Sequence, residues 1–149
     1  MRVLIQRVLE SKVVIDQNEH SCISKGILVL VGIENEDGEE DIDYLCKKII
    51  NLRIFDDKNG VMNESILQID GQIMVISQFT LQANTRKGNR PSYIKAAKPD
   101  IAIPIYERFC EKLEALSGIE IKTGVFGADM KISLTNDGPV TIWIDSKNR

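Results

Sequence analysis

The sequence predicts an α+β fold in one domain, residues 1–149, with a curved, largely antiparallel, barrel-like β-sheet and two principal helices. Three observations lead to this fold class. Segments with the pattern of strands outnumber those with the pattern of helices, and many of the strands are joined by short turns. Residues 26–33 form a run that is apolar on both faces, as in a central strand covered by helices. A chain of this length can bury a core without metal or disulfide support.

Nine segments have the composition of strands. They are residues 2–8, 12–16, 20–23, 26–33, 53–56, 72–81, 119–123, 130–134 and 140–144. The polar pair Glu10-Ser11 is expected to separate the first two strands, and the last two are expected to form a hairpin.

Two segments, residues 39–52 and 100–117, place apolar side chains at helical spacing. Acidic residues occupy the first turn of the first segment, where they favour the helix dipole. Gly118 is expected to cap the second helix at its carboxyl end.

Composition indicates a soluble, cytosolic protein. The beginning of the chain lacks the long apolar region of a secretory signal, and no segment is apolar enough to cross a membrane. Cys22, Cys46 and Cys110 are odd in number and share no CxxC spacing, so we expect three reduced, buried thiols. The localisation predicted from these features is cytoplasmic.

Charge is distributed unevenly along a chain whose net charge is −3. Residues 34–43 carry seven acidic side chains and no basic one. Residues 84–99 carry five basic side chains and no acidic one, namely Arg86, Lys87, Arg90, Lys95 and Lys98. This basic segment is either an ordinary solvated loop or a contact for phosphate groups.

The usual hydrolytic and cofactor motifs are missing. His20 is the only histidine and lies far in sequence from any candidate nucleophile, which disfavours a Ser-His-Asp or Cys-His site. The scattered thiols and single histidine supply no metal-ligand set, and no nucleotide-binding glycine motif occurs. We therefore expect neither a metal nor a cofactor.

Two other segments offer chemistry without such motifs. Ser77, Gln78, Phe79 and Thr80 end an apolar strand, and their polar groups form either a buried hydrogen-bond network or an oxyanion hole of N–H donors. In residues 136–141, NDGPVT, the carbonyls of Gly138 and Pro139 can face outward because Pro139 has no N–H and a fixed φ. Such a pair of carbonyls would accept an ammonium group, although a plain hairpin turn explains the same sequence.

Four strings in this order resemble the D-aminoacyl-tRNA deacylase family, also known as the D-tyrosyl-tRNA deacylase family. They are SQFTL at residues 77–81, TRKGNRPS at 85–92, FGADM at 126–130 and NDGPVT at 136–141. Residues 1–8 and 51–55 also fit, so the resemblance spans the whole chain. Asn89 departs from the pattern, where a basic residue is more usual, and this lowers the local charge available for tRNA.

The resemblance implies a homodimeric, metal-free ester hydrolase with active sites at the subunit interface and the 3′ end of aminoacyl-tRNA as its partner. It would release D-amino acids, and mischarged glycine, from tRNA as a step of chiral proofreading in translation quality control. Catalytic positions carried over are Ser77, Gln78, Phe79 and Thr80, with the Phe79 main chain at the ester carbonyl. The implied binding residues are Gly138, Pro139, Ala102, Phe126 and Met130 for the substrate, Arg7 to brace the Gly-Pro segment, and Arg86, Lys87 and Arg90 for tRNA.

In this family the Gly-Pro peptide is cis and reaches into the pocket of the partner subunit. Carried over, the carbonyls of Gly138 and Pro139 would bind the substrate ammonium and leave no room for an L side chain. Nothing near Thr80 in sequence could deprotonate it, so we favour assistance by the 2′-hydroxyl of the terminal adenosine. Arg7 has a simpler interpretation as a surface charge at a strand edge.

Two other classes of function remain open at this point. An RNA-binding module without catalysis would use the basic segment but not an acceptor pair for ammonium. A structural or partner-binding β-protein would need neither RNA affinity nor turnover.

Overall fold

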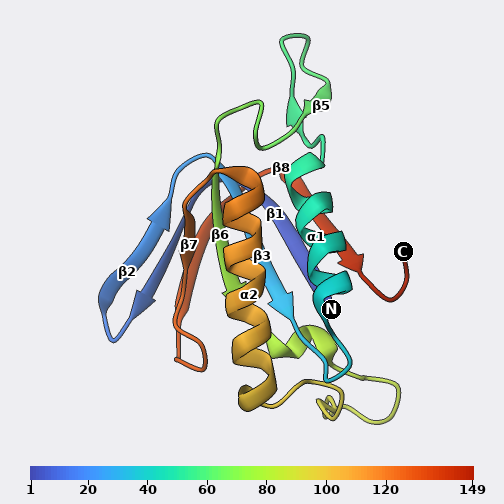
Figure 1. Ribbon diagram of the computed structural model, residues 1–149. Coiled ribbons are helices and arrows are strands. Elements are labelled where there is room, and N and C mark those ends of the chain that lie inside the picture. Colours follow the sequence, from blue (N-terminus) through green and yellow to red (C-terminus); the bar gives the residue numbers. More distant parts are fainter.

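The computed structural model describes residues 1–149, and its main sheet is organised around one long strand. This strand, β1 (Arg2–Ile15), pairs antiparallel with β8 (Lys131–Asp145) along nearly its whole length. On its other side, the first half of β1 pairs with β3 (Gly26–Gly32) and the second half with β2 (Asn18–Ile23). β6 (Gln72–Ser77) and β7 (Ile121–Thr123) follow β3. β4 (Phe55–Asp56) and β5 (Met62–Glu64) form a separate small hairpin (Figure 1).

The main sheet is mixed, so the prediction of a largely antiparallel sheet was wrong. β3, β6 and β7 run parallel to one another. Helix α1 (Glu39–Asn51) lies between β3 and β6 in the chain, and helix α2 (Pro99–Ser117) lies between β6 and β7. A helix that connects neighbouring strands returns the chain to its starting edge, which makes those strands parallel. Both helices lie side by side on one face of the sheet (Figure 1).

Both faces of β3 and β6 are buried, but helices cover only one of them. Val29, Val31 and Val75 face the helices and pack in the larger core with residues such as Leu45 and Phe109. The opposite face packs in a second cluster that comprises Val8, Val13, Ile23, Leu28, Met74 and Ile76. The sheet therefore curls over itself. Its ends approach through Ser21, whose hydroxyl donates to the Thr123 carbonyl over 2.7 Å, so that the sheet nearly closes into a barrel.

Two predicted chain breaks are not breaks in the structure. β1 continues through Glu10-Ser11, and β8 continues through the segment expected to be a hairpin turn. Both halves of β8 pair with β1, because Asn136 lies opposite Val8 while Thr141 lies opposite Gln6. Residues 137–140 therefore lie opposite the single residue Arg7 and bulge out of one strand. The continuous strand β1 supplies partners to both halves of β8, which explains why these halves do not pair with each other.

The other predicted elements lie close to their expected positions. Both helices are confirmed within one residue, and Gly118 ends α2 in the left-handed region with its N–H bonded to the Glu114 carbonyl. The strand expected at residues 72–81 stops at Ser77, and the short 3₁₀ helix η1 (Phe79–Gln82) follows it. All three cysteines are free thiols, as predicted. However, Cys22 is exposed and Cys110 is only partly buried, contrary to expectation.

The two ends of the chain meet in a buried cluster of charges beside α1. The Met1 ammonium is bonded to Asp37 and, over 2.8 Å, to the Ser146 hydroxyl. Ser146 donates to Asp41 over 2.6 Å, and Lys147 reaches the same carboxylate over 2.9 Å. This cluster ties the start of β1 and the end of β8 to the beginning of α1. Neither helix is long and apolar enough to span a membrane.

Candidate active site

A cavity of about 570 Å³ lies at the carboxyl ends of β3 and β6, under the beginning of α2. Most of its lining is apolar. Six of the predicted site residues line it, from three separate parts of the chain: Ser77, Gln78, Phe79, Ala102, Phe126 and Met130. Residues in positions more than fifty apart in the sequence therefore meet in one hollow, which is what a binding site for a small group requires.

The floor of this cavity is built by the turn from β6 into η1. The Gln78 N–H donates to the Val31 carbonyl over 2.7 Å, so the turn folds back onto the end of β3. Gly32 permits this approach, because a Cβ at that position would lie 2.7 Å from the Cβ of Leu81. η1 provides no acceptors within the helix for its first N–H groups, which belong to Phe79 and Thr80. The turn thus places main-chain donors beside an apolar hollow.

Thr80 is the predicted catalytic residue that does not line the cavity. Its hydroxyl oxygen accepts a hydrogen bond from the Gln78 side-chain amide over 2.6 Å. No histidine approaches it, since His20 is exposed on β2 and lines neither large cavity. The hydroxyl is therefore held by an amide, which cannot act as a general base.

The opposite wall comes from the link between β7 and β8 and from α2. Tyr106 is buried in α2, and its hydroxyl donates to the Val75 carbonyl over 2.8 Å. Burial raises the pKa of Tyr106, so it stays a neutral donor. Its ring meets Phe126 edge to face at 6.0 Å between centroids. Tyr106 thus fixes Phe126 against the sheet. Sequence reasoning missed this role, because Tyr106 resembled an ordinary apolar position of a helix.

The Gly138-Pro139 bulge lies elsewhere. Both residues are exposed on β8, and the peptide bond between them is cis. Val8 lies beside the bulge and pairs with Gly26, at the beginning of β3, whereas the cavity begins at Val31 on the same strand. Five residues of strand separate the two sites by about 17 Å. Within one chain, the bulge therefore does not reach the cavity.

Arg7 holds this bulge from inside the protein. The residue is only 6% exposed. Its Nε donates to the Asp137 carbonyl over 3.0 Å and lies 3.1 Å from the Asp137 carboxylate. Its Nη1 donates to the Ile54 carbonyl over 2.7 Å and to Asp56 over 3.2 Å. The guanidinium thus fixes the residue that precedes Gly138, which excludes the simpler interpretation of Arg7 as a surface charge.

Asn136 closes the bulge from the other side. Its side-chain oxygen accepts from the Val140 N–H over 2.8 Å, and its amide nitrogen donates to the Val140 carbonyl over 3.2 Å. The side chain takes the place of the strand partner that Val140 would otherwise have. The bulge is a braced loop whose Gly138 and Pro139 project from the sheet.

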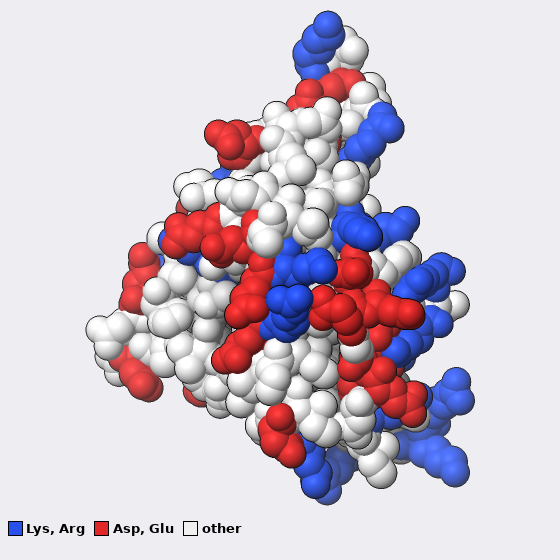
Figure 2. Space-filling view, viewed as in Figure 1, with Lys and Arg blue, Asp and Glu red and all other residues white.

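The predicted tRNA-binding residues Arg86, Lys87 and Arg90 lie exposed on the loop between η1 and α2. None of the five basic side chains of residues 84–99 forms an ion pair. Figure 2 shows basic side chains at the lower right, where Figure 1 places this loop, while acidic and basic side chains alternate over the helices. There, Lys112 pairs with Asp43 over 2.6 Å. The loop therefore carries positive charge that is free for a ligand.

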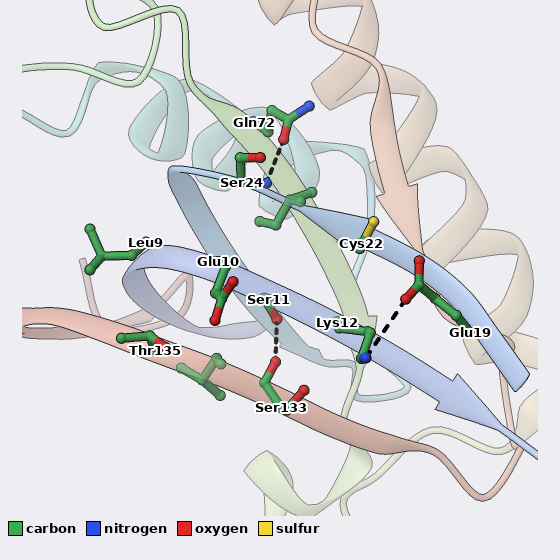
Figure 3. Close-up of a pocket in the computed structure, with 12 residues that line it drawn as sticks. Leu9, Glu10, Ser11, Lys12, Glu19, Cys22, Ser24, Gln72, Ser133 and Thr135 are labelled. Carbon is green, nitrogen blue, oxygen red and sulfur yellow. Dashed lines mark hydrogen bonds and ion pairs between the residues drawn. The ribbon is translucent and has the colours of Figure 1, made fainter. Parts of the chain in front are cut away.

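A second cavity, of about 630 Å³, is slightly larger but contains no predicted site residue. It lies between β1, β2 and β8 (Figure 3). Its polar groups bind one another: the Ser11 hydroxyl donates to the Ser133 carbonyl over 3.1 Å, and Lys12 lies 3.7 Å from Glu19. We favour the apolar cavity as the functional site, since it contains the predicted site residues and the basic side chains of the neighbouring loop form no ion pairs. No cluster of His, Cys, Asp or Glu in the structure is arranged to hold a metal ion.

Comparisons with known proteins agree with the sequence resemblance. The family described as D-Tyr-tRNA(Tyr) deacylase matches residues 4–145. Proteins named D-aminoacyl-tRNA deacylase are similar over the full chain, with 66% identity in Bacteroides fragilis and 62% in Flavobacterium johnsoniae, each covering 99% of the relative.

Two solved structures share the architecture. A protein titled "c-Myc DNA Unwinding Element Binding Protein" superposes with a TM-score of 0.93 at 37% identity, over 97% of this chain and 98% of that one. A probable eukaryotic D-amino acid tRNA deacylase superposes with a TM-score of 0.82 at 14% identity, over 96% of this chain and 97% of that one. The second likeness concerns the fold alone.

Proposed function

The chain belongs to the D-Tyr-tRNA(Tyr) deacylase family, and from that premise we propose that it hydrolyses the ester of D-aminoacyl-tRNA. The products are a free D-amino acid and tRNA. One observation carries this proposal: Ser77 to Phe79, Ala102 and Phe126 come from distant segments and line one apolar cavity. The cavity is large enough for an aminoacyl group, and its basic neighbour suits the phosphates of a tRNA end.

The chemistry depends on main-chain groups rather than on an acid–base side chain. Attack of water on the ester carbonyl places negative charge on the carbonyl oxygen, and the main-chain N–H of Phe79, which lines the cavity, is available to stabilise it. The bond to the ribose oxygen then breaks, and that oxygen takes up a proton. We propose that the neighbouring 2′-hydroxyl of the terminal adenosine assists the attacking water. No side chain of the cavity floor can act as a base, and Asp129, the one carboxylate of the lining, is exposed to solvent and paired with Lys131.

Chirality would be tested by the Gly138-Pro139 bulge of a second copy of the chain. The carbonyls of Gly138 and Pro139 would accept the substrate ammonium, and their main chain would occupy the space of an L side chain. Glycine would pass the same test, so mischarged glycyl-tRNA would also be hydrolysed. Three features support this arrangement. The bulge projects from the surface, Arg7 braces it, and the cavity of the same chain lies too far from the bulge for the two to meet.

This arrangement requires a homodimer in which each active site contains residues of both subunits. The partner molecule is the 3′ end of aminoacyl-tRNA, with phosphates held by Arg86, Lys87 and Arg90. We expect such an enzyme to work in the cytoplasm, where tRNAs are charged. No metal or other cofactor takes part in the proposed reaction.

The direct test is to incubate the protein with D-Tyr-tRNA, L-Tyr-tRNA and Gly-tRNA and to measure release of the amino acid. We expect hydrolysis of the D-tyrosyl and glycyl esters and none of the L-tyrosyl ester above the uncatalysed rate. Equal hydrolysis of both tyrosyl enantiomers would contradict the stereochemical part of the proposal. No hydrolysis of either would contradict the activity itself.

The shared site is tested by mixing two inactive variants. Ala102→Phe blocks the cavity and leaves the bulge intact, whereas Gly138→Val distorts the bulge and leaves the cavity intact. If subunits exchange at random, half of the dimers contain one complete site, and about a quarter of the activity returns. A mixture that stays inactive although exchange is shown by mass spectrometry would exclude a shared site.

The alternative is a nucleic-acid-binding protein without catalysis. The unpaired basic loop favours this function, but such a protein has no use for the apolar cavity. Tight binding of D-Tyr-tRNA without turnover would select this alternative.

A further inference from the structure

Two aromatic side chains at the rim of the apolar cavity have no role in the reaction described above. Phe79 is 55% exposed and Tyr93 is 38% exposed, and both line the cavity. Their rings meet edge to face with centroids 5.0 Å apart. The next residue, Ile94, is 86% exposed. Apolar groups gathered at one exposed place indicate a contact surface rather than chance exposure.

The fold fixes Tyr93 beside Phe79 and attaches it to the basic loop. Asn84 and Ser92 exchange two main-chain hydrogen bonds, of 2.8 and 2.9 Å, which close the loop of residues 85–91. Tyr93 follows directly after this closing pair. A few residues later, the Ala97 N–H donates to the Ile33 carbonyl over 2.9 Å and ties the segment to the end of β3. The aromatic pair therefore lies between the unpaired cations and the cavity.

This combination of groups suits one class of ligand. Cations without ion-pair partners attract phosphates, and exposed aromatic rings stack on the faces of nucleobases. Single-stranded RNA carries phosphates and unpaired bases together, whereas a duplex keeps its bases stacked on one another.

We propose that Phe79 and Tyr93 form a stacking platform for a nucleobase of the single-stranded 3′ end that carries the scissile ester. The inference rests on the proposed function, because the platform borders the cavity assigned to the ester. Stacking uses the face of a base rather than its edge. The platform therefore recognises that a base is present and not which base it is, so it serves all tRNAs alike.

Binding of an uncharged RNA oligonucleotide tests the platform without any reaction. The probe is a fluorescent tetranucleotide ending in CCA. A control oligonucleotide of the same length carries abasic riboses in place of the last two nucleotides. We expect Tyr93→Ala to weaken binding of the intact probe about tenfold and Tyr93→Phe to change it less than about threefold. The abasic probe should bind the wild type and Tyr93→Ala equally.

Tyr44 offers a matched control, since it is an aromatic residue on α1 that stacks with Arg149 outside the cavity. Tyr44→Ala should leave the affinity for the intact probe unchanged. The proposal is overturned if Tyr93→Ala binds the intact probe as tightly as the wild type does, or if the abasic probe binds the wild type as tightly as the intact one.

Kinetics with D-Tyr-tRNA separate this inference from the proposed function. We expect Tyr93→Ala to raise KM about tenfold and to leave kcat within about threefold, because stacking positions the RNA and not the reacting ester. A wild-type protein that does not hydrolyse the ester would refute the proposed function. An active wild type with an unchanged KM in Tyr93→Ala would refute the platform alone.

A second copy of the chain is the other possible cover for these rings. Sedimentation of the wild type and Tyr93→Ala decides between the two occupants. The oligomeric state should not change, and dissociation of the variant would assign the rings to a subunit interface and overturn the proposal.

Discussion

The apolar cavity and the Gly138-Pro139 bulge lie toward opposite ends of the sheet and are held in different ways. Four separate segments of the chain line the cavity, and most of this lining is apolar. The bulge is four residues long and depends on directional bonds from Arg7 and Asn136. A hollow can be formed by packing alone, whereas a protruding loop has little to pack against and needs a brace. The cavity has no projecting pair of carbonyls, and the bulge has no hollow for the ester. One chain by itself therefore holds only parts of the proposed site.

The largest effect is expected from filling the cavity. Ala102 is buried in the first turn of α2, and a phenylalanine there would occupy the space proposed for the ester. We expect Ala102→Phe to lower kcat/KM for D-Tyr-tRNA by about 100-fold or more, since small misplacements of a substrate already cost this much. Ser24→Phe fills the polar cavity instead and should retain full activity. Loss of activity in Ser24→Phe alone would move the active site to the polar cavity.

Removal of the brace should affect both stability and stereochemistry. Arg7→Ala leaves the Ile54 carbonyl and the Asp137 side chain without their partner, and we expect a loss of about 3 kcal/mol in the free energy of unfolding. Arg7→Lys keeps the charge but not the planar fork that reaches both groups. We expect the lysine variant to remain folded and to hydrolyse L-Tyr-tRNA at a measurable rate. A lysine variant with wild-type D/L preference would show that the bulge needs no brace.

Acid is expected to weaken the charge cluster that ties β1 and β8 to α1. Burial opposes the charge on Asp41, but hydrogen bonds from Lys147, Ser146 and the Gly38 N–H outweigh it and lower the pKa of Asp41 to about 2. The folded-state pKa is below the ordinary value near 4, so the stabilisation is complete above pH 4 and is lost as the pH falls toward 2. This loss amounts to about 2 kcal/mol.

Chemical denaturation at several pH values measures this effect. In Asp41→Asn the free energy of unfolding should be lower at pH 7 and should change less between pH 4 and pH 2. Glu120→Gln, which removes an exposed carboxylate bonded to Lys122, provides the control and should follow the wild type. An Asp41→Asn variant as sensitive to acid as the wild type would place the sensitive group elsewhere.

Neutralising the basic loop should weaken RNA binding without touching stereochemistry. We expect the triple variant Arg86→Gln, Lys87→Gln, Arg90→Gln to bind D-Tyr-tRNA about tenfold more weakly. The slope of log affinity against log salt should fall by about 2, because each contact with a single-strand phosphate contributes about 0.7. The ratio of D to L hydrolysis should not change. A changed ratio would mean that the loop contributes to the chiral pocket.

The smallest effect is expected at Thr80, which does not line the cavity and whose hydroxyl accepts a hydrogen bond from the Gln78 side-chain amide. If water attacks with help from the ribose 2′-hydroxyl, Thr80→Ala should keep kcat for D-Tyr-tRNA within about tenfold of the wild type, or ~1.4 kcal/mol of barrier. A substrate whose terminal adenosine lacks the 2′-hydroxyl should react far more slowly in both proteins. Loss of several orders of magnitude in Thr80→Ala, with binding intact, would identify the threonine as the nucleophile.

Local patterns in the sequence predicted both helices, because each places apolar residues at helical spacing on one face and Gly118 ends the second in the left-handed region. The sequence also contained the information that predicts a mixed sheet. The order strand, helix, strand at residues 26–77 and again at 72–123 requires that β3 and β6, and β6 and β7, run parallel. The short turns between other strands favour antiparallel pairing, but the two connecting helices make β3, β6 and β7 parallel. Tyr93 carried a weaker signal, as an aromatic residue directly after the basic loop.

By itself, the sequence determined the elements of this protein and the short strings that carry the chemistry, since these depend on neighbours within one or two turns of chain. Only the tertiary structure decided that Ser77, Ala102 and Phe126 share a cavity and that residues 137–140 leave a continuous strand. The bulge exists because β1, more than a hundred residues away, pairs with both halves of β8 and supplies Arg7 beneath it. Pairing over such distances depends on the register of whole strands and on packing between them, which no local pattern contains.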